Sequence, residues 1–179
     1  MTVTETFMKG LRVLEPNLLE DSRGVFFKTL HKEEFTKLNL PLDWSEEYFS
    51  LSHKNVIRGM HFQVPPEAHC KIVSCLKGSV LDVVIDLRKN SETFGKTFAT
   101  ELNDMNRKVL IIPKGCAHGF LSLQDNSLMF YKVSSIYSPE CDMGIRWNSI
   151  DFEWPTNKPI VSIRDEQHLD FKEFNSPFN

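Results

Sequence analysis

The stretch VLDVVIDL, residues 80–87, decides the fold class of this chain. Positions 81, 83, 85 and 87 are all apolar, whereas Asp82 and Asp86 occupy alternate positions between them. A period of two residues is typical of a β-strand that buries one of its faces. We therefore expect a strand here, with Asp82 and Asp86 on its polar face.

Short apolar runs of similar length recur through the middle of the chain, with turn-forming residues between them. Gly, Pro, Asn and Asp occupy the intervals, where they favour the backbone conformations of turns. This spacing is typical of an all-β sandwich or barrel. The further strands that we expect cover residues 25–30, 56–63, 71–76, 97–102, 108–112, 118–123 and 128–134. Two short helices, over residues 31–38 and 164–171, and a loose or partner-dependent tail over residues 175–179 complete the expected structure.

The composition fits one compact domain that spans residues 1–179, with 41% hydrophobic residues and a formal net charge of −3. The 21 basic residues are spread along the chain, which argues against a nucleic-acid partner. No apolar run is long enough to span a bilayer, and the first ten residues lack the apolar core of a secretory signal. We expect a cytoplasmic protein without a membrane partner, whose four cysteines are reduced and buried.

Charged residues are concentrated in the stretch VIRGMHFQVPPEAHCK, residues 56–71, although its beginning has the pattern of a strand. Charged groups inside a strand need partners or a function, so Arg58, His61 and Lys71 suggest a polar pocket. Strict alternation would place Arg58 and His61 on opposite faces of the strand. Gly59 lies between them, and a glycine inside a strand often marks a bulge that redirects a side chain. We expect such a bulge here.

Each of these side chains also has an ordinary structural explanation. A single histidine in a strand is more often a hydrogen-bonded structural residue than a base, because most buried polar groups simply satisfy one another. Tyr131, inside the strand expected over residues 128–134, would by itself be a core residue. Arg58 and Lys71 taken alone would be surface residues. Only the presence of all these residues together indicates a catalytic site.

A series of longer motifs follows in a fixed order along the chain. They read DSRG at 21–24, NVIRGMHFQ at 55–63, DVVIDLRKNSETFG at 82–95, IPKGCAHGF at 112–120, FYK at 130–132, YSP at 137–139, GIRWN at 144–148 and SIRD at 162–165. Together they resemble the RmlC family, the dTDP-4-dehydrorhamnose 3,5-epimerases of the cupin superfamily. The resemblance implies an all-β, cupin-type jelly-roll barrel with short peripheral helices, in a homodimer that uses neither a metal nor another cofactor.

The resemblance also implies the reaction of an isomerase, a carbohydrate epimerase that inverts C3, C5 or both in a nucleotide-linked 4-keto-6-deoxyhexose. The 4-keto group acidifies the hydrogens on the neighbouring carbons, so inversion needs one group that removes a proton and another that returns one. By similarity, His61 is the base and Asp165 fixes its tautomer. Tyr131 reprotonates the opposite face, and Lys71 stabilises the negative charge that grows on the C4 oxygen.

Four further positions match the substrate-binding part of the family pattern. Arg23 and Arg58 match positions that hold the diphosphate, a task that suits a planar guanidinium. His118, in the AHGF sequence, matches a position that lines the same cavity. Gln63, at the end of the HFQ sequence, is the fourth candidate contact to the substrate.

The nucleotide-binding region departs from the family pattern. The family commonly has a QDNHS-like run where this chain has EEYFS at residues 46–50, so we take Glu46 and Tyr48 as the substrate contacts there. Ile136 stands where an aromatic residue often precedes the tyrosine of the YSP motif. Both departures leave CDP, GDP or UDP sugars open beside dTDP. Inversion at C3 alone also stays open beside inversion at both carbons, because the same catalytic residues can serve either outcome.

Two other classes of protein compete with an epimerase as explanations of these residues. A metal-dependent cupin would use His61, His69 and His118 as ligands, but Gln63 stands at the position where metal cupins usually have a second histidine. A non-catalytic module that binds sugar nucleotides would need the arginines but no proton relay. The presence of both a candidate base and the candidate acid Tyr131 therefore favours an enzyme.

Overall fold

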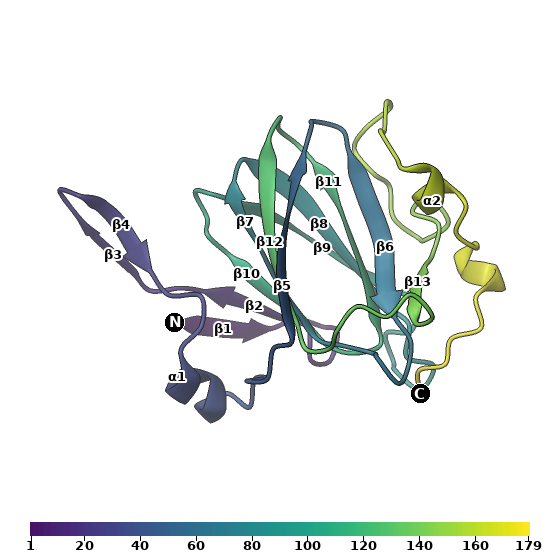
Figure 1. Cartoon of the computed structure of the whole chain (residues 1–179), viewed down its shortest axis with the longest axis horizontal. Helices are drawn as coiled ribbons and strands as arrows, with labels where there is room; N and C mark the ends of the chain where they lie inside the picture. The colour runs from purple at the N-terminus through teal and green to yellow at the C-terminus, as the bar shows by residue number, and fades with distance from the viewer.

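Two antiparallel sheets face each other in the computed structural model, which describes every residue from Met1 to Asn179 (Figure 1). The six-stranded sheet has the order β1 (Thr2–Glu5), β2 (Arg12–Glu15), β10 (Val109–Ile112), β7 (Lys71–Lys77), β12 (Ser127–Val133) and β5 (Glu46–Ser52). The five-stranded sheet has the order β13 (Asp142–Gly144), β6 (Ile57–Gln63), β11 (Cys116–Ser122), β8 (Ser79–Asp86) and β9 (Thr97–Asn103). From β5 onward the chain crosses repeatedly between the sheets, which confirms the all-β jelly-roll.

Three apolar clusters hold these layers together. The first lies between the sheets and includes Val84 of β8 and Leu110 of β10. The second covers the outer face of the five-stranded sheet, where Trp154 and other residues after β13 pack on β6, β8 and β11. The third covers the outer face of the six-stranded sheet, where Phe35 of α1 (Lys32–Lys37) contributes. The five-stranded sheet is therefore buried on both of its faces.

This double burial corrects the expectation for β8. The strand forms as predicted, but Asp82 and Asp86 do not face solvent, because both are fully buried. Asp82 points between the sheets and bonds to a histidine of β11, whereas Asp86 accepts hydrogen bonds from Arg88, Ser91 and Thr93. The alternation therefore marks a strand, but its polar positions bind interior partners.

The expected helix over residues 164–171 is wrong in extent. Helix α2 spans only Ile163–Glu166, and a 3-10 turn, η1, follows at Phe171–Glu173. Between them Leu169 forms a parallel bridge with Ile145, which pulls the chain into an extended path. The expected loose tail is also wrong, because Ser176 and Phe178 are buried. None of the helices is long and apolar enough to cross a membrane.

One hairpin stands apart from the barrel. Strands β3 (Leu18–Asp21) and β4 (Gly24–Phe27) pair only with each other and project from the six-stranded side (Figure 1). The predicted strand over residues 25–30 overlaps β4, but it does not join the barrel. Leu19 and Phe26 on this hairpin are more than half exposed, so much of their apolar surface is left uncovered in this chain.

Candidate functional site

A cavity of about 460 Å³ lies between the two sheets. Residues from β5, β7 and β12 line one wall, and residues from β6 and β11 line the other. Eight of the ten predicted site residues lie in this lining: Glu46, Tyr48, Arg58, His61, Gln63, Lys71, His118 and Tyr131. The topology therefore gathers side chains that are far apart in the sequence.

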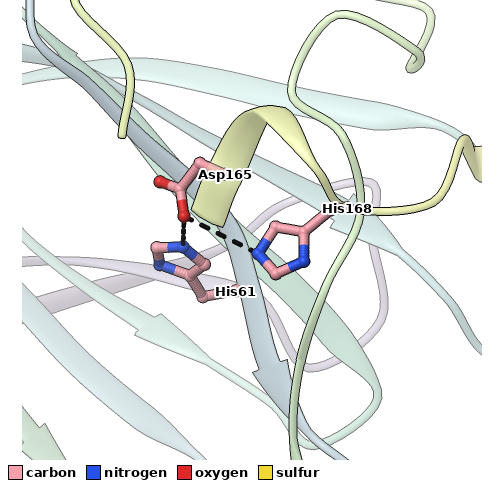
Figure 2. A group of neighbouring side chains, drawn as sticks. All are labelled: His61, Asp165 and His168. Atoms are coloured by element: carbon pink, nitrogen blue, oxygen red, sulfur yellow. Dashed lines mark hydrogen bonds and ion pairs between the residues drawn. The ribbon is translucent and has the colours of Figure 1, made fainter. Parts of the chain in front are cut away.

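A histidine–aspartate pair forms at the edge of the cavity. Asp165 of α2 lies outside the lining, but its Oδ1 is 2.7 Å from Nε2 of His61 (Figure 2). The backbone N–H of Gly59 donates to Oδ2 of the same carboxylate at 3.1 Å. The Ser162 hydroxyl caps α2 by accepting from the Asp165 N–H, which fixes the residue in place. Because an ionised Asp165 is an acceptor, Nε2 of His61 carries the hydrogen and Nδ1 is left with a free lone pair.

The two members of this pair are held in the protonation states that a base needs. Burial alone would raise the pKa of the Asp165 carboxyl, but the imidazoles of His168 and His61 and the Gly59 amide hold it well below its ordinary value. Burial lowers the pKa of His61, and the charge of Lys71 adds to this, although Asp165 opposes it. At neutral pH the pair is therefore a neutral imidazole against a carboxylate.

The expected bulge in β6 is confirmed. His61 lies opposite His118 on β11, whereas Arg58 lies opposite Phe120, so three steps along β6 match two along β11. Gly59 adopts a φ of +139°, and a Cβ atom there would collide with the backbone of β11. The bulge places both Arg58 and His61 at the cavity, which strict alternation would have prevented.

Lys71 and Tyr131 face His61 from the other sheet. The Lys71 ammonium donates to the backbone carbonyl of His61 at 3.2 Å, and burial lowers its pKa to about 8. The Tyr131 hydroxyl lies 3.0 Å from that of Ser50 on the neighbouring strand. Burial raises the pKa of Tyr131 well above its ordinary value, so its phenol keeps its proton. A neutral base, a cation and a neutral acid thus share one cavity.

A second histidine–aspartate pair lies deeper between the sheets. Nε2 of His118 is 2.8 Å from Oδ2 of Asp82, and both side chains are buried. Burial raises the pKa of Asp82, although the contact with His118 opposes this. The His118 ring also meets the edge of Tyr131, with 6.2 Å between ring centroids. Sequence reasoning missed Asp82, because the period of the strand does not show which interior group the carboxylate binds.

Three other residues that were predicted to contact the substrate already have hydrogen-bond partners within the chain. Arg58 donates to the Ser52 hydroxyl at 3.0 Å, and its side chain is exposed. Both ends of the Gln63 amide are bonded within the chain, since it donates to the carbonyl of Ile136 and accepts from the N–H of Ser138. Glu46 accepts from the backbone N–H of Tyr137 at 2.8 Å. These residues line the cavity, but part of their polar capacity is already used.

Arg23 is not brought together with the others. It lies at the turn of the β3–β4 hairpin, is largely exposed and pairs with Asp21 of the same hairpin. The structure therefore separates this predicted diphosphate contact from the cavity of its own chain.

Sequence reasoning missed several lining residues, although some of them carried a signal. Tyr137 belongs to the YSP motif and Arg164 to the SIRD motif, and both line the cavity. Ser50 shares the parity of Glu46 and Tyr48 on β5, so recognition of that strand would have found it. Asp142 of β13 pairs with Arg164 at 2.6 Å and carried no local signal.

The three histidines that a metal-dependent cupin would use as ligands have separate hydrogen-bond partners. His61 binds Asp165, His118 binds Asp82, and His69 lies 3.0 Å from the Ser135 hydroxyl. The structure instead brings three possible ligand atoms within 4.8 Å of one another at His61, Asp165 and His168.

Comparisons with known proteins agree with this geometry. The family model for dTDP-4-dehydrorhamnose 3,5-epimerase matches residues 5–173. The dTDP-4-dehydrorhamnose 3,5-epimerase of Escherichia coli K12 is 41% identical over 171 residues, which cover 93% of this chain and 92% of that protein. A dTDP-4-dehydrorhamnose 3-epimerase of Streptomyces niveus is 33% identical, with coverages of 90% and 80%. The crystal structure of a Legionella pneumophila 3,5-epimerase with dTDP-4-keto-L-rhamnose superposes with a TM-score of 0.92 at 30% identity, covering 97% of this chain and 94% of that one.

Proposed function

Because the chain belongs to the dTDP-4-dehydrorhamnose 3,5-epimerase family, we propose that it inverts C3 and C5 of a dTDP-linked 4-keto-6-deoxyhexose. The observation that carries the proposal is the placement of a carboxylate-bound imidazole on one wall of a cavity and a protonated phenol on the other. An epimerase of this kind is an isomerase that needs two proton-handling groups on opposite faces of one sugar ring.

The proposed mechanism assigns one step to each of these groups. Nδ1 of His61 takes the proton from the carbon next to the keto group, and Asp165 stabilises the imidazolium that forms. The electron pair moves onto the C4 oxygen, where the Lys71 ammonium stabilises the enolate. Tyr131 then gives its proton to the opposite face of the same carbon. Exchange with solvent returns a proton to Tyr131 and removes one from His61, so the enzyme is restored after each inversion.

Substrate binding is proposed to follow the rim of the cavity. Arg58 lies at the cavity and carries a guanidinium suited to paired hydrogen bonds with phosphate oxygens. Glu46 and Tyr48 line the same cavity from β5, where the nucleotide would enter. Two comparisons support dTDP as the nucleotide. The matching family is that of the dTDP-4-dehydrorhamnose 3,5-epimerases, and the superposed Legionella pneumophila structure contains dTDP-4-keto-L-rhamnose.

A homodimer is the second part of the proposal. Arg23 lies on a hairpin that projects from its own barrel, so it can contact a diphosphate only in the cavity of another subunit (Figure 1). Insertion of the hairpin into a second copy would also cover Leu19 and Phe26. All four cysteines are free, which is typical of a reducing compartment, and we therefore propose a cytoplasmic location.

The test is turnover in heavy water with dTDP-4-keto-6-deoxyglucose, followed by NMR location of the deuterium. We expect deuterium at both C3 and C5, with the dTDP sugar preferred over its CDP, GDP and UDP analogues. Deuterium at C3 alone would establish an enzyme that inverts only that carbon. Binding of the sugar nucleotide without any deuterium incorporation would overturn the proposal in favour of a non-catalytic binding module.

A further inference from the structure

His168 is a second imidazole on the carboxylate of Asp165. Figure 2 shows His61 and His168 both directed at Oδ1, and the two Nε2 atoms lie 2.7 Å and 3.6 Å from that oxygen. The two rings are nearly perpendicular, with an interplanar angle of 76° and 5.9 Å between their centroids. Nε2 of His168 is buried and makes no hydrogen bond with any group of the protein. A buried polar atom without a hydrogen bond costs free energy, so its presence calls for an explanation.

The chain holds the His168 ring at this place. Its neighbour Leu169 is fixed by the bridge to Ile145, directly after β13. The ring covers Gly144, which lies opposite His61 in the pairing of β13 with β6. A Cβ atom at Gly144 would come within 2.3 Å of Nε2 of His168, so only glycine leaves room for the imidazole. His168 itself does not line the cavity and can reach the chemistry only through Asp165.

We propose that His168 is a positioning residue for the epimerase, which shares the Asp165 carboxylate with His61 and so limits how tightly that carboxylate holds the proton on His61. The inference rests on the proposed role of His61 as the base. A carboxylate oxygen can accept from two N–H donors, and each donor reduces the negative charge available to the other. Since 3.6 Å is longer than a hydrogen bond, His168 acts mainly through its charge distribution, and His61 keeps the stronger contact.

This sharing suits a base that must release its proton in every cycle. An unshared buried carboxylate would stabilise the imidazolium of His61 more strongly, so that proton removal from the sugar would be easier but release of the proton would be harder. The second imidazole reduces this stabilisation while the Gly59 amide still fixes the orientation of Asp165. His168 therefore adjusts the basicity of His61 without contact with the substrate.

The other charged groups around His61 come from three elements. Lys71 lies on β7 and Arg164 on α2, next to Asp165, and both oppose protonation of His61. Asp142 of β13 forms an ion pair with Arg164. Asp170, two residues after His168, pairs with Arg146. A substitution at position 168 leaves all of these groups in place. Any change that it causes in the pKa of His61 can therefore be attributed to the shared carboxylate.

The test compares variants that keep or remove the donor. His168→Phe keeps the ring volume without an N–H, whereas His168→Gln keeps an amide N–H at a similar reach. His53→Phe is the matched control, because it removes an exposed imidazole that lies 3.7 Å from Asp125, away from the cavity. The pKa of His61 is measured by NMR of protein labelled with ¹⁵N in its histidines, and the pH profile of kcat/KM is recorded for each variant.

We expect the pKa of His61 to rise in His168→Phe by roughly half a unit, less than the loss of a full hydrogen bond to the carboxylate would give. The fall of kcat/KM on the acid side then moves to higher pH by the same amount, because the base must be unprotonated. His168→Gln and His53→Phe should titrate like the wild type.

An unchanged His61 pKa in folded His168→Phe would overturn the inference and leave His168 a packing residue. If that variant does not fold, His168→Met, which also lacks the donor, decides the question in the same way. The NMR titration needs no substrate, so it tests the inference by itself. Absence of turnover by the wild type would instead count against the proposed function.

Discussion

Tyr48 and Tyr131 stack inside the cavity, with ring centroids 4.7 Å apart and an angle of 16° between the ring planes. The two residues lie directly opposite each other on β5 and β12. Burial raises the pKa of Tyr48 to about 12, and the nearby Glu46 adds to this, so both phenols stay neutral at neutral pH. The stack restricts the ring of the proposed acid.

Removal of this stack is expected to lower turnover. Tyr48→Asn should reduce kcat by about 2- to 10-fold, because an aromatic pair contributes about 0.5–1.5 kcal/mol beyond its buried area. Tyr48→Phe keeps the stacked ring and should remain close to the wild type. The measurement is kcat together with the ratio of deuterium at C3 and C5. Equal activity of both variants would show that the stack does not hold Tyr131.

Lys71→Met should separate catalysis from binding. Loss of the cation opposite the developing enolate is expected to lower kcat on the order of 10²-fold or more. The affinity for dTDP, measured by calorimetry, should change little, since the proposed phosphate contact is Arg58. Lys77→Met at the exposed end of the same strand is the control and should retain full activity. A parallel loss of dTDP binding in Lys71→Met would place Lys71 in binding instead.

The pH dependence of kcat/KM should be bell-shaped. Burial lowers the pKa of His61 below its ordinary value, so activity on the acid side falls only below about 6.5, where the imidazole gains its proton. Burial lowers the pKa of Lys71 to about 8, so activity declines as the pH rises through that value and the ammonium is lost. Rates measured between pH 5 and 10 test both limbs. A plateau that extends to the ordinary lysine pKa would contradict the role of Lys71.

Asp165 and His61 should behave as one functional unit. Asp165→Asn removes the charge that fixes the tautomer and is expected to lower kcat by about 10²- to 10⁴-fold. His61→Asn should cost at least as much, and the double variant should be no slower than His61→Asn alone, because residues that act together are not additive. Multiplied losses in the double variant would show that the two residues act independently.

Gly144→Ala should destabilise the fold through a clash with His168. Overpacking of this kind costs about 1–3 kcal/mol, and the backbone of Gly144 lies outside the region that requires glycine. Addition of His168→Ala should recover part of the loss by emptying the contested space. Urea denaturation of the two single variants and the double variant gives the coupling energy. Additive losses would mean that the ring and the glycine do not compete for the same volume.

The sequence predicted the strands and most of the lining because both depend on local pattern. Alternation identified β8, and Gly59 correctly predicted the bulge that brings Arg58 and His61 together. Strand β5 was missed because EEYFSLS has charged residues at its start and lies at the edge of its sheet. Because β5 has an exposed face, its sequence lacks the pattern of apolar residues by which the other strands were recognised.

Contacts between distant segments could not be predicted in the same way. The burial of Asp82 depends on a histidine of another strand, which the local period does not reveal. His168 lies next to His61 only because the chain turns back after α2, where Leu169 bridges to Ile145. The proposed roles of the site residues remain predictions, although the cavity brings eight of the ten together.

The two halves of the dyad are separated by 104 positions along the chain. During translation the strand that bears His61 emerges early, whereas its carboxylate leaves the ribosome long after most of the barrel strands. All the strands of the two sheets precede Asp165 in the chain, so the imidazole is synthesised well before its acceptor. A chain that stops before Asp165 would therefore carry the proposed base without the carboxylate that fixes its tautomer, and we expect it to be inactive.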